Sequence, residues 1–175
     1  MCSSDLVLKS LGLYALMAQC GLFIPAYKAQ FPIYTKFMAD IGDRQSIEDD
    51  LSTFSAHIQN LATIVEQANE NTLILLDELG TGTDPDAGAA LSRAIMESLI
   101  QKNCTVIATT HLGSLKVWAS DEKGIINGGM IFNSEALAPT YELQLGTPGA
   151  SYALEISKRM GLSDDIINQI GRAHV

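Results

Sequence analysis

Residues 73–88, LILLDELGTGTDPDAG, decide the fold of this chain. The four apolar residues at 73–76 are typical of a strand buried on both faces of a parallel sheet. Asp77 and Glu78 follow directly. Successive side chains along a strand point to opposite sides, so we expect the two acids to have different tasks. One can hold Mg²⁺ through water while the other faces an attacking water, which predicts a hydrolytic site that uses a metal ion.

A second apolar strand, expected at 104–109, closes with Thr109, Thr110 and His111. Strand and helix patterns alternate through the middle of the chain, which predicts an α/β fold with a mostly parallel sheet and helices on both faces. An acid pair after one strand and a histidine after the next are typical of a P-loop NTPase of the ABC-like type. A histidine that caps the following helix is the alternative for His111, and threonines at strand ends are often caps.

The periodicity places the elements in more detail. Pro85 suits the first turn of a helix with Asp84 as its N-cap, and Gly21 is placed to end the first helix. Residues 42–50 are expected to form a polar, acidic loop. Helices are expected at 7–19, from Ser52 through Ala68, and at 85–102, 112–118 and 150–160; strands are expected at 34–41, 72–77 and 104–109, with a late hairpin or sheet edge at 125–132 and 140–145.

Five motifs of this chain are informative when taken together: ADIGD at 39–43, LSTF at 51–54, LDELGTGTDP at 76–85, TTH at 109–111 and ASYALEISKR at 150–159. They resemble the motifs of the MutS family of DNA-transaction ATPases. They are most similar to the second bacterial branch, which is associated with suppressing recombination rather than with mismatch repair. The resemblance runs over residues 7–170 and implies part of a MutS-type ATPase domain, within a homodimer that uses ATP and Mg²⁺ to switch a DNA-bound clamp.

The resemblance implies a role for each matching residue. Asp77 would bind Mg²⁺ through its water shell, Glu78 would be the general base, and His111 would sense the γ-phosphate. Ser52 would reach the γ-phosphate of the partner subunit. Nucleotide contacts would also come from Thr53, Gly80 and Thr110.

Each of these roles has a plainer alternative from the residues alone. The free N–H groups at a helix N-terminus suit an anion, but Ser52 and Thr53 would also serve as an ordinary N-cap. The acid pair would suit a strand-to-loop junction without any catalytic role. Gly80 and Gly82 would suit a simple turn as well as a close approach of another backbone.

One expected motif does not occur in these 175 residues, the Gly-x-x-x-x-Gly-Lys-Ser/Thr phosphate loop. Lys9-Ser10 follows Leu6, Val7 and Leu8 instead of glycine. We therefore expect this chain alone not to hydrolyse ATP. The resemblance implies that the strand leading into such a loop lies in the sheet core near strand 72–77, so without it we expect unpaired N–H and C=O groups beside this apolar run and low stability. Residues 1–6 and 171–175 resemble translated sequencing adapters, so the ATPase reading is confined to 7–170.

The formal net charge of −9 bears on what the chain binds. Surfaces that hold nucleic acid are normally basic, so we expect DNA, or a ribosome, to be bound by other regions of a larger protein. No apolar run is long enough to span a membrane, and the three scattered cysteines favour the cytoplasm.

Two other functions stay open at this point. An ABC-type transporter ATPase subunit would carry a Leu-Ser-Gly-Gly-Gln signature, where this chain has LSTF. A non-catalytic dimerisation or binding module would use the acid pair only structurally. Whether the larger protein acts on recombination intermediates, mismatches or stalled ribosomes is not determined by these residues.

Overall fold

The computed structural model describes residues 3–42, 50–133, 136, 138–149, 152–163 and 165–167. The chain forms two compact units, Met1–Ile125 and Ile126–Val175. The expected loop at 42–50 falls almost entirely outside the described residues.

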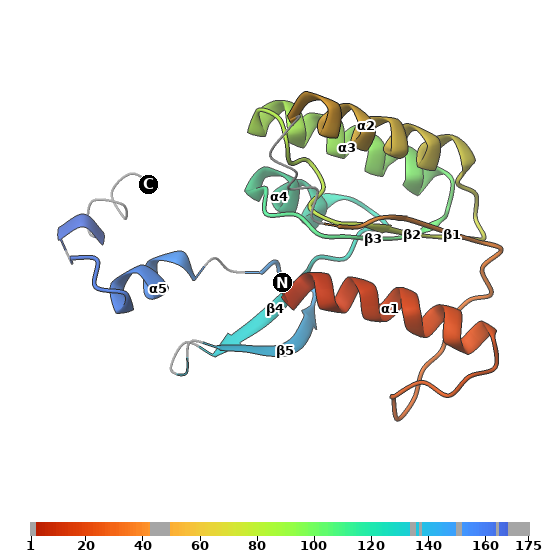
Figure 1. Cartoon of the computed structure of the whole chain (residues 1–175), viewed down its shortest axis with the longest axis horizontal. Helices are drawn as coiled ribbons and strands as arrows, with labels where there is room; N and C mark the ends of the chain where they lie inside the picture. Colours follow the sequence, from red (N-terminus) through yellow and green to blue (C-terminus); the bar gives the residue numbers. More distant parts are fainter. Residues whose placement is uncertain are drawn as a thin grey trace. The chain divides into compact units, whose positions relative to one another are not determined.

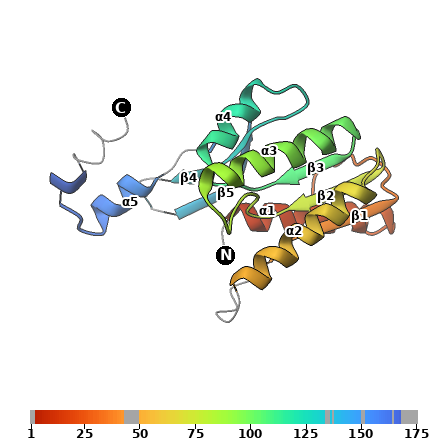
Figure 2. The ribbon, with the colours of Figure 1, turned by 90° about the horizontal axis from the view of Figure 1, so that it is seen from above.

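The first unit is built on a parallel sheet of β1 (Lys36–Asp40), β2 (Thr72–Leu76) and β3 (Thr105–Ala108), in the order β1-β2-β3. Helices α2 (Asp50–Gln67) and α3 (Pro85–Gln101) connect the strands and lie on one face of the sheet, and α1 (Ser3–Gln19) lies on the other (Figure 1). Figure 2 shows α2 and α3 from above. The sequence prediction of a mostly parallel α/β sheet with helices on both faces is confirmed.

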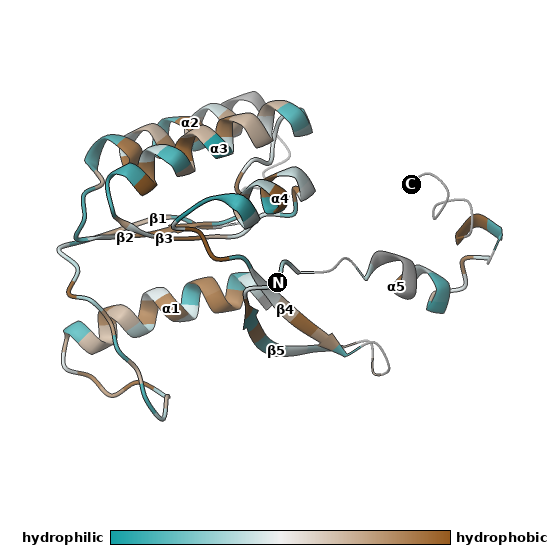
Figure 3. Ribbon diagram, turned by 180° about the vertical axis from the view of Figure 1, so that it is seen from behind, coloured by the Kyte–Doolittle hydropathy of each residue, from teal (hydrophilic) through white to brown (hydrophobic). Residues whose placement is uncertain are grey.

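Every residue of β2 is buried, because the strand serves two cores. Leu73 and Leu75 pack with Leu8 and Ala15 of α1. Ile74 and Leu76 point the other way and join the core formed with α2, α3 and α4 (Gly113–Asp121), whose buried members also include Leu61, Ile64, Leu99 and Leu115. Figure 3 shows apolar residues along most of α1, in keeping with the exposed Leu6, Leu13 and Leu16 on its outer side.

The expected unpaired edge beside strand 72–77 is wrong. Ile74 lies opposite Met38 of β1 and Val106 of β3, and β2 is hydrogen-bonded along both of its edges. Within the described residues the outer strands of this sheet are β1 and β3. The two crossover helices place the neighbouring strands on either side of the most apolar strand, so its backbone groups are satisfied.

Hydrogen bonds confirm the predicted C-terminal end of α1 and the predicted N-terminal start of α3. Gly21 has φ +73°, its N–H donates to Ala18 O at 3.1 Å, and Leu22 N–H donates to Met17 O at 2.9 Å, which is a Schellman motif. Asp84 Oδ1 accepts from the backbone N–H groups of Asp86 and Ala87, at 3.0 and 3.2 Å. Both ends follow from local sequence signals alone.

The C-terminal end of α2 is capped from elsewhere in the unit. Its last turn carries no basic residue. Instead, Lys36 Nζ donates to Gln67 O at 3.0 Å, and Lys102 Nζ donates to the carbonyl oxygens of Val65 and Glu66, the latter at 3.2 Å. Two cations from β1 and the end of α3 thus satisfy the negative end of the α2 dipole.

The second unit contains the antiparallel hairpin of β4 (Gly128–Asn133) and β5 (Ala138–Leu145), so the predicted hairpin is confirmed. The rings of Phe132 and Tyr152 stack with centroids 4.9 Å apart. Helix α5 (Ala153–Arg159) is followed by Gly161 at φ +94°, close to its predicted end. Among the described residues, no helix is long and apolar enough to cross a membrane.

Candidate functional site

Thr109 joins the two predicted halves of the site at the carboxyl ends of β2 and β3. Its Oγ1 donates to Asp77 Oδ1 at 2.6 Å and accepts from the Glu78 backbone N–H at 2.8 Å. Its backbone continues the ladder, with Thr109 N–H donating to Leu76 O at 2.9 Å and Leu79 N–H donating to Thr109 O at 2.8 Å. Thr109 therefore connects the acid pair to the segment that follows β3.

The two acids have different environments. Asp77 is half-buried and its carboxylate is oriented by Thr109, whereas Glu78 is exposed. Within the described residues, the Glu78 carboxylate makes no hydrogen bond or ion pair. Glu78 also has φ +49°, a left-handed conformation that costs energy for a residue with a side chain and is concentrated at functional sites.

Thr110 and His111 follow Thr109 in the chain, and their side chains have different environments. Thr110 Oγ1 donates to Leu79 O at 2.9 Å and accepts from Leu112 N–H at 3.2 Å, so both capacities of this hydroxyl are in use. The His111 side chain is exposed. The first residue before α4 is Leu112, which provides no side-chain cap, so His111 does not cap this helix. Its role as a phosphate sensor stays a prediction.

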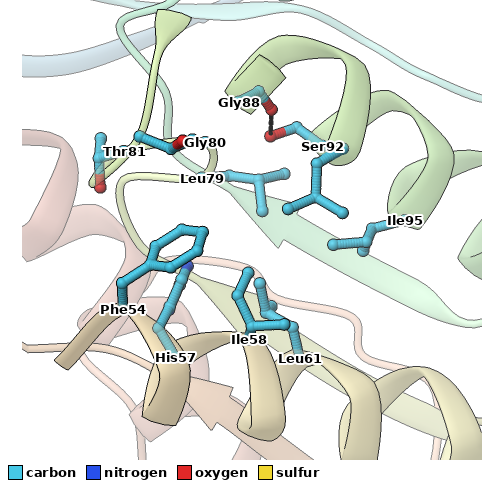
Figure 4. A pocket seen from close by; sticks show the side chains of 12 residues that line it. Phe54, His57, Ile58, Leu61, Leu79, Gly80, Thr81, Gly88, Ser92 and Ile95 are labelled. Carbon is cyan, nitrogen blue, oxygen red and sulfur yellow. Dashed lines mark hydrogen bonds between the residues drawn. The ribbon is translucent and has the colours of Figure 1, made fainter. Parts of the chain in front are cut away.

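The loop after the acids is packed tightly on α3. Gly80 has φ +92°, and a Cβ built on it would lie 2.6 Å from Ser92 Oγ. A Cβ built on Gly88 would lie 2.2 Å from Gly80 O, so the two backbones touch. Buried Ser92 donates from Oγ to Gly88 O at 2.6 Å, as Figure 4 shows. The sequence predicted the close approach at Gly80 but not its partners, although small residues spaced four apart on α3 were a visible signal.

A small, mainly apolar pocket lies between α2, α3 and this loop. Phe54, His57, Ile58 and Leu61 project into it from α2 and face Leu79, Gly80, Ser92 and Ile95 (Figure 4). Phe54 Cδ2 would lie 3.3 Å from a Cβ on Gly82, whose φ is +83°. The aromatic ring thus fits against the part of the loop that has no side chain.

Ser52 and Thr53 lie inside the first turn of α2, because the helix begins at Asp50. The helix therefore begins two residues earlier than the predicted start at Ser52. Their side chains lie outside the part of the chain that the structure describes, so their proposed phosphate contacts stay a prediction.

A buried cluster around Asp40 was not predicted from the sequence. The Asp40 side chain is 4% exposed; its Oδ1 accepts from Asn60 Nδ2 at 2.9 Å and its Oδ2 pairs with His57 Nδ1. The Asp40 backbone O accepts from Asp77 N–H at 2.8 Å. Among the described residues, no three His, Cys, Asp or Glu side chains are grouped to hold a metal ion.

Thr109→Val is expected to destabilise the first unit by about 1–3 kcal/mol, because it leaves the Glu78 N–H without its acceptor and Asp77 without its donor. Thr105→Val, at the first residue of β3, is the matched control, since the Thr105 hydroxyl makes no hydrogen bond within the described residues. It should change stability by less than about 0.5 kcal/mol. Urea unfolding of both variants measures the difference. The two hydrogen bonds that Thr109 Oγ1 makes with Asp77 and Glu78 are called the Thr109 bridge. Equal effects of the two substitutions would mean that this bridge contributes nothing to stability.

The fold and the site define an α/β domain with two carboxylates and a histidine segment at the carboxyl edge of a parallel sheet. The family model of MutS domain V matches residues 1–174, so the chain belongs to this family. It is 52% identical over 163 residues to the putative endonuclease MutS2 of Bacillus subtilis, and 49% identical over 163 residues to the endonuclease MutS2 of Thermus thermophilus. Each match covers 93% of this chain but only 21% and 22% of those relatives, so the chain spans about a fifth of their length.

Proposed function

We propose that this domain is the ATP-hydrolysing part of a larger MutS-type protein that acts on DNA, in recombination control or in mismatch repair. The observation that carries the proposal is the Thr109 bridge, which holds one carboxylate in place and leaves the next one accessible. The parallel sheet, with its acids at the carboxyl edge, supports a P-loop NTPase of the ABC-like type. The MutS2 names of the relatives favour the second bacterial branch.

The two acids suit separate roles in this reaction. Asp77 is held by Thr109 Oγ1 and would bind Mg²⁺ through water, and a single protein carboxylate is typical where substrate phosphates complete the coordination. Bound Mg²⁺ would offset the charge that develops on the phosphates. Glu78 is exposed, and its carboxylate is available to accept a proton from the attacking water. The exposed His111 would donate to the γ-phosphate.

The cofactors would be ATP and Mg²⁺, and a phosphate loop would have to come from outside these 175 residues. The test is a chimera in which this chain replaces the matching 163 residues of the Bacillus subtilis relative. The chimera should hydrolyse ATP only with Mg²⁺, and the 175-residue chain alone should not hydrolyse it. The absence of hydrolysis by a folded chimera would contradict the proposal, and hydrolysis by the isolated chain would contradict the need for a phosphate loop from outside it.

The domain is also proposed to form a homodimer, with Ser52, Thr53 and the loop at Gly80 near the partner's nucleotide. Its net charge of −9 favours DNA contacts by other regions of the protein. Mixed dimers with Ser52→Ala in one subunit distinguish the two roles of this serine. If Ser52 contacts the partner's phosphate, the substitution would impair the partner's nucleotide site. If Ser52 contacts only its own helix, the substitution would affect only the mutated subunit.

A further inference from the structure

We propose that His57 is a positioning residue: by holding Asp40, it fixes the N-terminal half of α2 at a set distance from Asp77. The inference deepens the proposed function and rests on it. It assigns a task to a histidine that lies apart from the acid pair and from the Thr-Thr-His segment.

The Asp40 carboxylate is a buried charge whose hydrogen bonds are satisfied by α2. The Asp40 side chain is 4% exposed and that of His57 is 17% exposed. Both Asp40 oxygens are engaged, Oδ2 by His57 Nδ1 and Oδ1 by Asn60 Nδ2 at 2.9 Å. A buried carboxylate without partners is strongly unfavourable, so these two donors have to stay where they are.

The geometry of α2 lets two of its side chains reach Asp40. His57 and Asn60 are three residues apart and therefore lie on one face of the helix, where both reach the same carboxylate. Apolar contacts such as those of Ile58 hold the helix on the sheet, but the hydrophobic effect that drives them is non-directional. Two directional hydrogen bonds to one buried group fix the position of the helix along its axis.

The backbone of Asp40 also connects this cluster to Asp77. Asp40 O accepts from the Asp77 N–H at 2.8 Å, so one residue of β1 is bonded both to α2 and to the first residue after β2. Ser52 lies five residues before His57 in the same helix, which is about 7.5 Å along the axis. His57 thus sets the spacing between the helix turn that holds Ser52 and the edge that holds Asp77.

The first test uses the 175-residue chain and amide hydrogen exchange. His57→Leu removes the donor and keeps the bulk, while His57→Asn keeps a donor close to the position of Nδ1. Gln59→Leu, on the exposed side of α2, is the matched control. In His57→Leu the Asp77 amide and the first half of α2 should exchange at least about 10-fold faster, while the Ile74 amide in β2 is unchanged.

His57→Asn should restore slow exchange, and Gln59→Leu should not alter it. Equal acceleration at Ile74 and Asp77 would mean that His57 contributes only general stability, and this would overturn the proposal. Unchanged exchange in His57→Leu would overturn it as well.

The second test measures steady-state ATP hydrolysis by the chimera. His57→Leu should lower kcat by about 10- to 100-fold, because small displacements of reacting groups are costly. KM for ATP should stay within about a factor of two, because the lost interaction does not bind the substrate. His57→Asn should recover most of kcat. A wild-type kcat in His57→Leu would overturn the proposal.

Failure of the proposed function gives a different result. A chimera that does not hydrolyse ATP with His57 intact, or one whose activity is unaffected by Glu78→Ala, would contradict the ATPase assignment. The exchange comparison of Asp77 with Ile74 then decides by itself whether His57 fixes the edge of the sheet.

Discussion

Glu78→Ala in the chimera is expected to stop ATP hydrolysis while nucleotide binding persists. A positioned general base contributes about 10²–10⁴-fold to a rate, so the catalysed rate should fall by a factor in this range. The base acts on the attacking water in the transition state and adds little to the affinity for ATP. The structure supports this division, since the Glu78 side chain is exposed while Asp77 is held by Thr109.

Single-turnover hydrolysis and the Kd for ATP, both with Mg²⁺, separate the two effects. Glu70→Ala is the control, because Glu70 is an exposed acid just before β2, at the end of the strand opposite to the site. It should leave both quantities unchanged. A parallel loss of affinity and rate in Glu78→Ala would mean that this acid is structural, as the non-catalytic alternative requires.

Ile74→Ala is expected to lower the free energy of unfolding by about 2–5 kcal/mol. Ile74 is fully buried at the centre of β2 and faces the core shared with α2, α3 and α4. A cavity at this position cannot be filled easily, because strands lie on both sides of β2. Val117→Ala, at a residue that is 69% exposed on α4, is the matched control and should change stability by no more than about 0.5 kcal/mol.

Urea unfolding gives both values, and amide exchange adds an internal check. The amides of β2 should exchange more slowly than those of the outer strands β1 and β3, because β2 is hydrogen-bonded along both edges. A loss below about 1 kcal/mol in Ile74→Ala, within the range of a surface change, would contradict the central place of β2 in the core.

Local patterns in the sequence were enough to predict much of the fold. The apolar run before Asp77 predicted a strand buried on both faces, and all five residues of β2 are buried. The hydrogen bonds of the caps at Gly21 and Asp84 join residues only a few positions apart, so both caps could be predicted from the local sequence. The carboxyl ends of neighbouring parallel strands meet at one edge, which is why Asp77 after β2 and Thr109 after β3 come within hydrogen-bond distance.

The tertiary structure alone decided which side chains complete the site. Thr109 lies 32 residues from Asp77, and nothing in its local pattern distinguishes a bridging threonine from a cap. The pairing of His57 with Asp40, the contact between Gly80 and Gly88 and the capping of α2 by Lys102 likewise join different elements of the fold. Periodicity reveals which face of a helix or strand is buried, because that depends on spacing along one element. The choice of partner depends on the register between elements, which is set only when the helices pack on the sheet.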